Sequence, residues 1–236
     1  MTFNIKPEER SRMGIRILLA DDHKIMREGL RSLIERHSRF EIVGEAEDGR
    51  TTVQLAQELT PDIVIMDIGM PELNGIEATH RIKTILPKIR IIALSMYYDR
   101  RFVSGMLGAG ASGYLRKDCA LDELVTAIEV VAKNGTYLSP RVAQAEVMGN
   151  TNRFSKSSRP DLAGLTDRQR EVLQSLSEGK NTKQIASGLR ISVKTVETHI
   201  LNIKEKLDIH STAELTRYAI REGLTFLEPG LPPSKS

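Results

Sequence analysis

The sequence has few of the features that would assign the protein to a structural class at once, such as many cysteines or a long apolar run. Among 236 residues there is one cysteine, Cys119, and no tryptophan. A single cysteine excludes a disulfide framework and a cysteine-rich metal site, and it fits a reducing cytoplasm. No apolar run approaches the roughly 18 residues of a membrane span, and residues 1–13 lack the apolar core of a secretory signal. We therefore expect a cytoplasmic protein with no membrane partner.

Charge of one sign is not in large excess either. Thirty-four Lys and Arg residues against 31 Asp and Glu leave a net charge of +3, which permits nucleic-acid binding but does not argue for it. What the sequence does have is ordinary globular composition, with 40% hydrophobic residues. This length and composition predict one or two domains with a buried core.

Residues 14–138 alternate between apolar strands and amphipathic helices. The central strand, Asp62–Asp67, has four consecutive apolar residues, as expected for a strand covered on both faces. Five alternations predict an α/β fold, a parallel sheet with helices on both sides. The expected strands are 15–20, 40–44, 62–67, 90–95 and 113–115; the expected helices begin near Met26, Thr51, Ile76, Asp99 and Leu121.

The composition changes after Leu138. A possible short helix from Ser139 to Met148 leads into a polar stretch, and we assign 139–160 as a linker. Residues 161–228 contain only helical patterns, with expected N-terminal caps at Thr166, Asn181, Ser192 and Ser211. We expect residues 1–13 and 229–236 to be disordered.

Polar residues gather at the carboxyl ends of the predicted strands, where ligands bind in open α/β sheets. The set is Asp21 and Asp22 after the first strand, Asp67 after the third, Ser95 after the fourth and Lys117 after the fifth. Clustered carboxylates favour a hard cation such as Mg²⁺. An aspartate is a competent nucleophile toward phosphorus, and a hydroxyl and an ammonium can hold phosphoryl oxygens. A single acid at the end of a strand is often only a solvated loop residue. We expect His23 to border the next helix rather than bind metal.

The second unit contains two helices joined by a short connection, from Asn181 to Leu207. The later helix has an apolar stripe from Val196 to Leu207, and its opposite face can enter the major groove of DNA. That face carries Lys194, Glu197, Thr198 and Leu201. The unit carries no net charge by residue count, so the pattern alone leaves open a helical bundle with a solvated face.

The first unit resembles a response-regulator receiver domain. The resemblance is carried by Asp21-Asp22, residues 66–71 with Gly75, Leu94-Ser95 and residues 113–117. It implies a flavodoxin-like sheet of order 2-1-3-4-5 and phosphorylation of Asp67 by a sensor histidine kinase. It further implies Mg²⁺ on Asp21, Asp22, Asp67 and the backbone carbonyl of Gly69, with Lys117 at the phosphoryl group and Ser95 and Tyr114 as switch residues. Without the resemblance, Tyr114 is a space-filling strand aromatic.

The second unit resembles the LuxR-type helix-turn-helix, through residues 165–173, Gly179, 183–186, 191–199 and Lys206-Leu207. The resemblance implies that Lys194, Glu197, Thr198 and Leu201 face bases. It places Lys183, Thr195, His199 and Lys204 at the DNA backbone. It also implies a dimer contact through the last helix at Leu215 and Ala219, for which core packing is an equal alternative.

Together the two units resemble a NarL/FixJ-family response regulator. We predict a transcription regulator, not an enzyme, that forms a homodimer when phosphorylated, binds promoter DNA and acts with RNA polymerase. One alternative is a phosphorylation-independent DNA-binding protein that uses the receiver as a dimerisation scaffold. Another is a phosphotransferase or hydrolase with Asp67 as nucleophile, although the chain shows no substrate cap.

Overall fold

Each strand predicted for the first unit forms in the computed structural model, and one more follows. The strands are β1 (Ile15–Ala20), β2 (Phe40–Ala46), β3 (Ile63–Asp67), β4 (Arg90–Ser95), β5 (Gly113–Arg116) and the unpredicted β6 (Tyr137–Leu138). All neighbours pair in parallel, in the order β2-β1-β3-β4-β5-β6. The expected order 2-1-3-4-5 is therefore confirmed, with β6 added at one edge.

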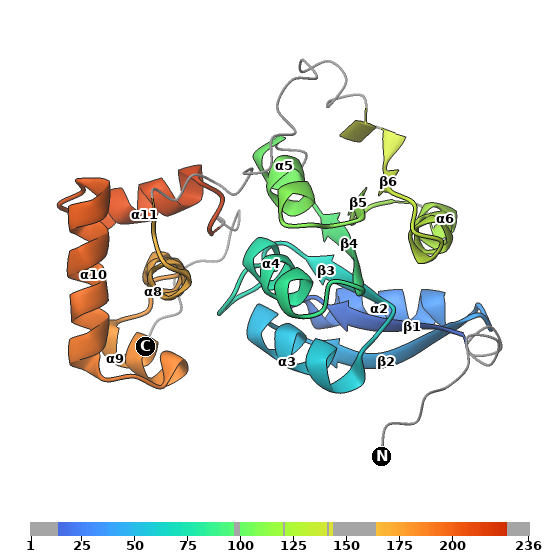
Figure 1. The fold of residues 1–236 in the computed structure, drawn as a ribbon, viewed down its shortest axis with the longest axis horizontal. Helices are drawn as coiled ribbons and strands as arrows, with labels where there is room; N and C mark the ends of the chain where they lie inside the picture. The colour runs from blue at the N-terminus through green and yellow to red at the C-terminus, as the bar shows by residue number, and fades with distance from the viewer. Residues whose placement is uncertain (1–13, 97–99, 120, 141, 144–163, 226–236) are drawn as a thin grey trace. The chain divides into compact units, whose positions relative to one another are not determined.

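The structure describes residues 14–96, 100–119, 121–140, 142–143 and 164–225 (Figure 1). The chain divides into two compact units. The two predicted termini, most of the linker and the part of the possible helix beyond residue 143 lie outside the described residues. No helix within the described ranges has the length and apolar character needed to cross a membrane.

In the described part of the first unit, five helices cover the two faces of the sheet (Figure 1). Their bounds are α2 Lys24–Ile34, α3 Gly49–Leu59, α4 Gly75–Ile85, α5 Arg100–Gly108 and α6 Leu121–Ala132. On one face, α2 and α6 pack against β1, β3, β4 and β5 around Ile17, Ile65 and Leu115. On the other face lie α3, α4 and α5.

The central strand is buried on both faces, as its unbroken apolar run predicts. From Ile63 to Met66 no side chain is more than 1% exposed. Alternate residues serve opposite layers, with Ile63 and Ile65 in the core shared with α2 and α6. This burial fixes the position of Asp67, the last residue of β3.

Gly75, the first residue of α4, lies against the main chain at the end of β3. A Cβ atom there would be 2.0 Å from the carbonyl oxygen of Asp67. Its N–H donates to the carbonyl of Ile68 at 2.9 Å. Only glycine therefore allows α4 to begin this close to Asp67.

The second unit consists of four helices in its described part, and local sequence sets where each begins. Thr166, Asn181 and Ser211 form capping boxes with Gln169, Gln184 and Glu214, and Ser192 accepts from the N–H of Thr195. The predicted caps are thus confirmed. The helices are α8 Asp167–Ser177, α9 Thr182–Leu189, α10 Val193–Leu207 and α11 Thr212–Arg221.

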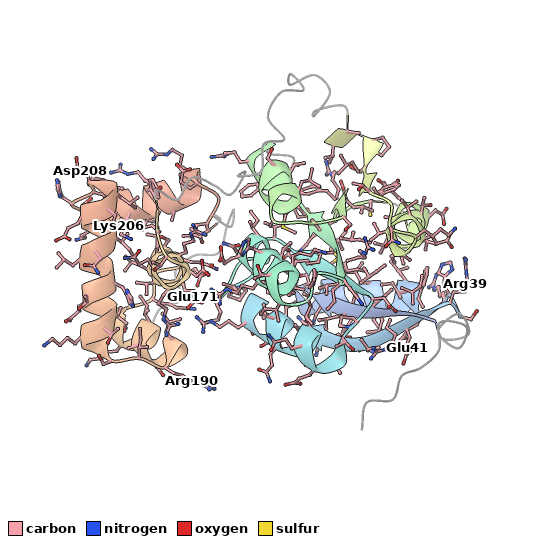
Figure 2. The ribbon with its side chains drawn as sticks, in the orientation of Figure 1. Arg39, Glu41, Glu171, Arg190, Lys206 and Asp208 are labelled. Carbon is pink, nitrogen blue, oxygen red and sulfur yellow. The ribbon has the colours of Figure 1, made fainter. Side chains whose placement is uncertain are left out.

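Left-handed residues end α9 and α10, at Arg190 and Asp208, each with a φ of 53° (Figure 2). Lys206 donates from Nζ to Gln169 Oε1 at 3.0 Å, and so links the end of α10 to the capping box of α8. The core beneath these helices includes Val172, Ile185 and Ile203. This core sets the orientation of α10 within its unit.

Candidate functional site

The acids at the ends of β1 and β3 converge. Ligand atoms of Asp21, Asp22, His23 and Asp67 all lie within 4.8 Å of one another. Asp21 and Asp67 are 2% and 5% exposed, because each ends a central strand of the sheet. The predicted meeting of these carboxylates is what a parallel sheet with right-handed crossovers produces.

Lys117 follows β5 and reaches into this cluster. Its Nζ lies 2.7 Å from Asp21 Oδ2 and 2.8 Å from Asp67 Oδ2. Asp67 Oδ1 accepts a hydrogen bond of 2.7 Å from the N–H of Ile68. Both oxygens of the Asp67 carboxylate are thus oriented by named donors.

Burial and neighbouring charges shift the acidity of this pair. Burial raises the pKa of Asp67 to about 6; Lys117 opposes the rise, whereas Asp21 and Asp22 add to it. Burial lowers the pKa of Lys117, but the carboxylates of Asp67 and Asp21 more than offset this and the net pKa is raised. Lys117 therefore stays protonated beside two carboxylates.

The donor set fits a divalent cation. Three carboxylates face one ammonium, so negative charge remains uncompensated in a buried place. Carboxylate oxygens are the ligands that Mg²⁺ prefers. Gly69, which the resemblance assigns as a carbonyl ligand, stands in the exposed part of the loop just after β3.

Ser95 and Tyr114 lie on β4 and β5 beside β3. Ser95 ends β4 and is 2% exposed, and its carbonyl accepts from the N–H of Lys117 at 2.9 Å. Tyr114 pairs in register with Ala93 and is fully buried. The ring therefore lies in the interior of the first unit.

His23 stands at the N-cap position of α2, as expected, but its side chain makes no capping hydrogen bond. The ring instead faces the acids, with Nδ1 2.8 Å from Asp22 Oδ1 and 3.3 Å from Asp21 Oδ1. Sequence reasoning missed Arg27, whose Nη1 donates to the carbonyl of Asp21 at 2.6 Å. Its signal was a charge on the inward face of the helix, three residues before Leu30.

A second candidate surface lies on α10. Val196 and Ile203 are fully buried in the core, with Ile200 and Leu207 packed against it. The opposite face is exposed, as predicted, and Leu201 is 56% exposed among polar neighbours. The exposed residues of this face are Lys194, Glu197, Thr198 and Leu201; Lys183 and Thr195 are also exposed, and His199 and Lys204 are partly exposed.

The hydroxyl of Thr198 donates to the carbonyl of Lys194 at 2.9 Å. Thr198 and Leu201 are both exposed and lie three residues apart, so they are neighbours on this face of the helix. Side chains of these two types are able to contact the methyl group of thymine.

The expected dimer contact at Leu215 and Ala219 is wrong for these side chains. Both are fully buried, within the core of their own unit. A second copy cannot touch them while that core is intact. Core packing, the alternative weighed for them from the sequence, is what the structure bears out.

Comparisons with known proteins identify the family of both units. Residues 17–129 match the response regulator receiver domain, and residues 163–219 match the bacterial regulatory proteins of the luxR family. The transcriptional regulatory protein MctR of Rhizobium johnstonii is 40% identical over 90% of this chain and 96% of its own. The chain belongs to the LuxR-type response regulators.

Solved structures of such response regulators resemble it as well. A LuxR-family two-component response regulator from Aurantimonas sp. SI85-9A1 is 42% identical, with a TM-score of 0.56 over 58% of this chain and 99% of that one. The response regulator RcsB in a complex with DNA is 25% identical, with a TM-score of 0.53 over 87% of this chain and 97% of that one. Members of the family are DNA-binding transcription regulators.

Proposed function

We propose that this response regulator receives a phosphoryl group on Asp67 from a sensor histidine kinase and regulates transcription in response. The observation that carries the proposal is the contact of Lys117 with both Asp67 and Asp21 inside the buried acidic cluster. This arrangement would bring together a fixed nucleophile, a cation site and an ammonium group that can bind the phosphoryl group.

Asp67 would act as the nucleophile. One carboxylate oxygen forms a bond to phosphorus as the bond from phosphorus to the imidazole nitrogen of the kinase breaks. Because β3 is buried on both faces, the carboxylate is held still for in-line attack. The ammonium of Lys117 is close enough to Asp67 to bind the oxygens of the transferred phosphoryl group.

Asp21, Asp22, Asp67 and the carbonyl of Gly69 would hold Mg²⁺, which neutralises charge on the phosphoryl oxygens when bound. Ser95 would contact the phosphoryl group, and Tyr114 would follow it as the second switch residue. Phosphorylation then shifts a two-state equilibrium of the receiver, which favours a homodimer on promoter DNA, where RNA polymerase is the further partner. The setting for this activity is the cytoplasm.

The α10 face supports the DNA half of the proposal. Lys194, Glu197, Thr198 and Leu201 would meet base edges. Lys183, Thr195, His199 and Lys204 would meet phosphates, whose contacts position the helix without specifying sequence. Because the unit carries no net charge by residue count, these lysines would supply the local phosphate attraction.

Labelling with a small phosphodonor tests the phosphoacceptor. With acetyl phosphate and Mg²⁺, wild type should take up one phosphoryl group and Asp67→Asn none, by intact-protein mass spectrometry. Asp62→Asn, which changes an exposed acid just before β3, is the matched control. An Asp67→Asn variant that still labels would place the acceptor elsewhere, and steady turnover of phosphate esters would favour the hydrolase alternative.

Genome-wide DNA binding tests the output. The wild type treated with beryllofluoride, a phosphoryl mimic, should occupy paired half-sites that the untreated protein leaves largely empty. Equal occupancy in both states would favour the phosphorylation-independent alternative.

A further inference from the structure

Arg27 is a buried cation beside the acidic cluster. The proposed chemistry does not use it. It lies in the first turn and a half of α2 and is 8% exposed. Burying a guanidinium is costly unless its donors find acceptors. Its acceptors are therefore a guide to what it does.

The shortest contact of Arg27 is to main chain. Nη1 donates to the carbonyl oxygen of Asp21 at 2.6 Å. Two acids lie farther away, with Glu45 Oε2 3.5 Å from Nε and Glu47 Oε1 3.9 Å from Nη2. Glu45 and Glu47 thus balance the positive charge of Arg27. The hydrogen bond of its Nη1 goes to the carbonyl oxygen of Asp21.

That bond completes the fixation of Asp21. The N–H of Asp21 donates to the carbonyl of Ala46 at 3.1 Å, at the end of β2. Its Oδ1 accepts from the N–H of His23 at 2.9 Å, and its Oδ2 pairs with Lys117. With Arg27 on the carbonyl, both main-chain groups and both carboxylate oxygens of Asp21 have partners.

We propose that Arg27 is a positioning residue for the metal-binding acids. By holding the carbonyl of Asp21, it fixes the turn between β1 and α2, so that the carboxylates of Asp21 and Asp22 face Asp67. Residues that hydrogen-bond to metal ligands and orient them commonly affect metal affinity in this way. The inference rests on the proposed function, because it assumes that these acids bind Mg²⁺.

The charge of Arg27 and its positioning role predict opposite effects. A nearby cation repels Mg²⁺, so removing it should strengthen Mg²⁺ binding if only charge matters. Removing the donor should weaken binding if Arg27 holds Asp21 in place. The sign of the change in Mg²⁺ affinity therefore separates the two.

The same helix supplies a matched control. Arg31, one turn after Arg27, also pairs with Glu45, and it contacts Glu35 as well. Within the described part of the chain, Arg31 makes its ion pairs with Glu35 and Glu45 and none with Asp21. Replacing Arg31 removes a cation and an ion pair with Glu45 but leaves the Asp21 carbonyl bonded to Arg27.

The experiment measures the Kd for Mg²⁺ by isothermal titration calorimetry on the full-length chain. We expect Arg27→Met and Arg27→Gln each to raise the Kd by about 10-fold or more, in the range seen for outer-shell partners. Arg27→Lys keeps a donor of similar reach and should recover most of the affinity. Arg31→Met should stay within about 2-fold of wild type, since it leaves the Asp21 carbonyl bonded. Far-UV circular dichroism checks that each variant is folded.

Unchanged or tighter Mg²⁺ binding by Arg27→Met would overturn the inference, as would an equal loss in Arg31→Met. Should methionine at position 27 prevent folding, the shorter polar side chain of Arg27→Gln decides on the same criterion. A wild type that neither binds Mg²⁺ nor labels with acetyl phosphate would overturn the proposed function and this inference together. Suppose instead that the wild type binds Mg²⁺ and labels with acetyl phosphate, while the Arg27 variants have an unchanged Kd for Mg²⁺. That result would overturn the inference alone.

Discussion

Asp67→Asn should make the metal-free protein more stable at neutral pH. The carboxylate of Asp67 has its pKa raised to about 6 from an ordinary value of 3.8, mainly by burial. Ionising it in the folded protein therefore costs more than ionising it in the unfolded chain. Asparagine has nearly the same shape and cannot ionise, so it avoids that cost.

The size and sign follow from proton linkage. Between about pH 4 and pH 6 the folded state holds a proton on Asp67 that the unfolded state has lost, so the free energy of unfolding falls as pH rises. The rise of the Asp67 pKa from 3.8 to about 6 corresponds to about 3 kcal/mol. The variant and wild type should be about equally stable below pH 4 and differ by up to about 3 kcal/mol above pH 6.

Urea unfolding of the full-length chain in EDTA, followed by circular dichroism between about pH 4 and pH 8, measures the difference. Hydrogen exchange of the β3 amides assigns the transition to the first unit. Asp62→Asn makes the same chemical change at an exposed carboxylate that accepts from the N–H of Arg16, and it is the matched control. Saturating Mg²⁺ should reduce the gain from Asp67→Asn, because a bound cation stabilises the ionised carboxylate.

Parallel stability curves for wild type and Asp67→Asn across this pH range would refute the reasoning. They would mean that Asp67 has an ordinary pKa, and that Lys117 fully compensates the burial of the carboxylate. A variant less stable than wild type at pH 7 would mean that the ion pair with Lys117 stabilises the fold on balance.

Four further predictions test other parts of the molecule. Lys117→Met should raise the pKa of Asp67 further, because Lys117 opposes the rise, as carboxyl NMR titration in EDTA would show. Gly75→Ala should destabilise the first unit by about 1–3 kcal/mol through the clash with the Asp67 carbonyl, measured by urea unfolding beside Gly29→Ala, where a Cβ meets nothing within 4 Å. Leu215→Ala should destabilise the second unit by about 2–5 kcal/mol while acetyl phosphate labelling persists; unchanged stability would return Leu215 to the interface. Glu197→Ala should relax preference at one base position in a binding-site selection, whereas uniform weakening would remove Glu197 from base readout.

Local chemistry explains why much of this fold could be predicted. The capping boxes at Thr166, Asn181 and Ser211 each join residues three apart, so both partners are visible in the sequence. The buried central strand was equally visible, since an apolar run needs cover on both faces. The meeting of Asp21, Asp22, Asp67 and Lys117 followed from topology, because parallel strands bring their carboxyl ends to one edge.

Other features depended on distant contacts. The strand β6 has two residues, too few for a periodic pattern. Periodicity gave Leu215 and Ala219 a common face of α11, but could not say whether their own core or a second copy covers it. The core of the same unit covers both.

The sequence by itself determined the alternation of strands and helices, the ends of the helices and the residue types gathered at one edge of the sheet. Each of these depends on neighbours within a few positions or on a general rule of parallel sheets. Only the tertiary structure decided that Lys117 bridges Asp21 and Asp67 and that Arg27 holds the carbonyl of Asp21. The physical reason is that a main-chain acceptor is the same at every residue, so no side-chain pattern reveals which carbonyl a buried arginine will reach.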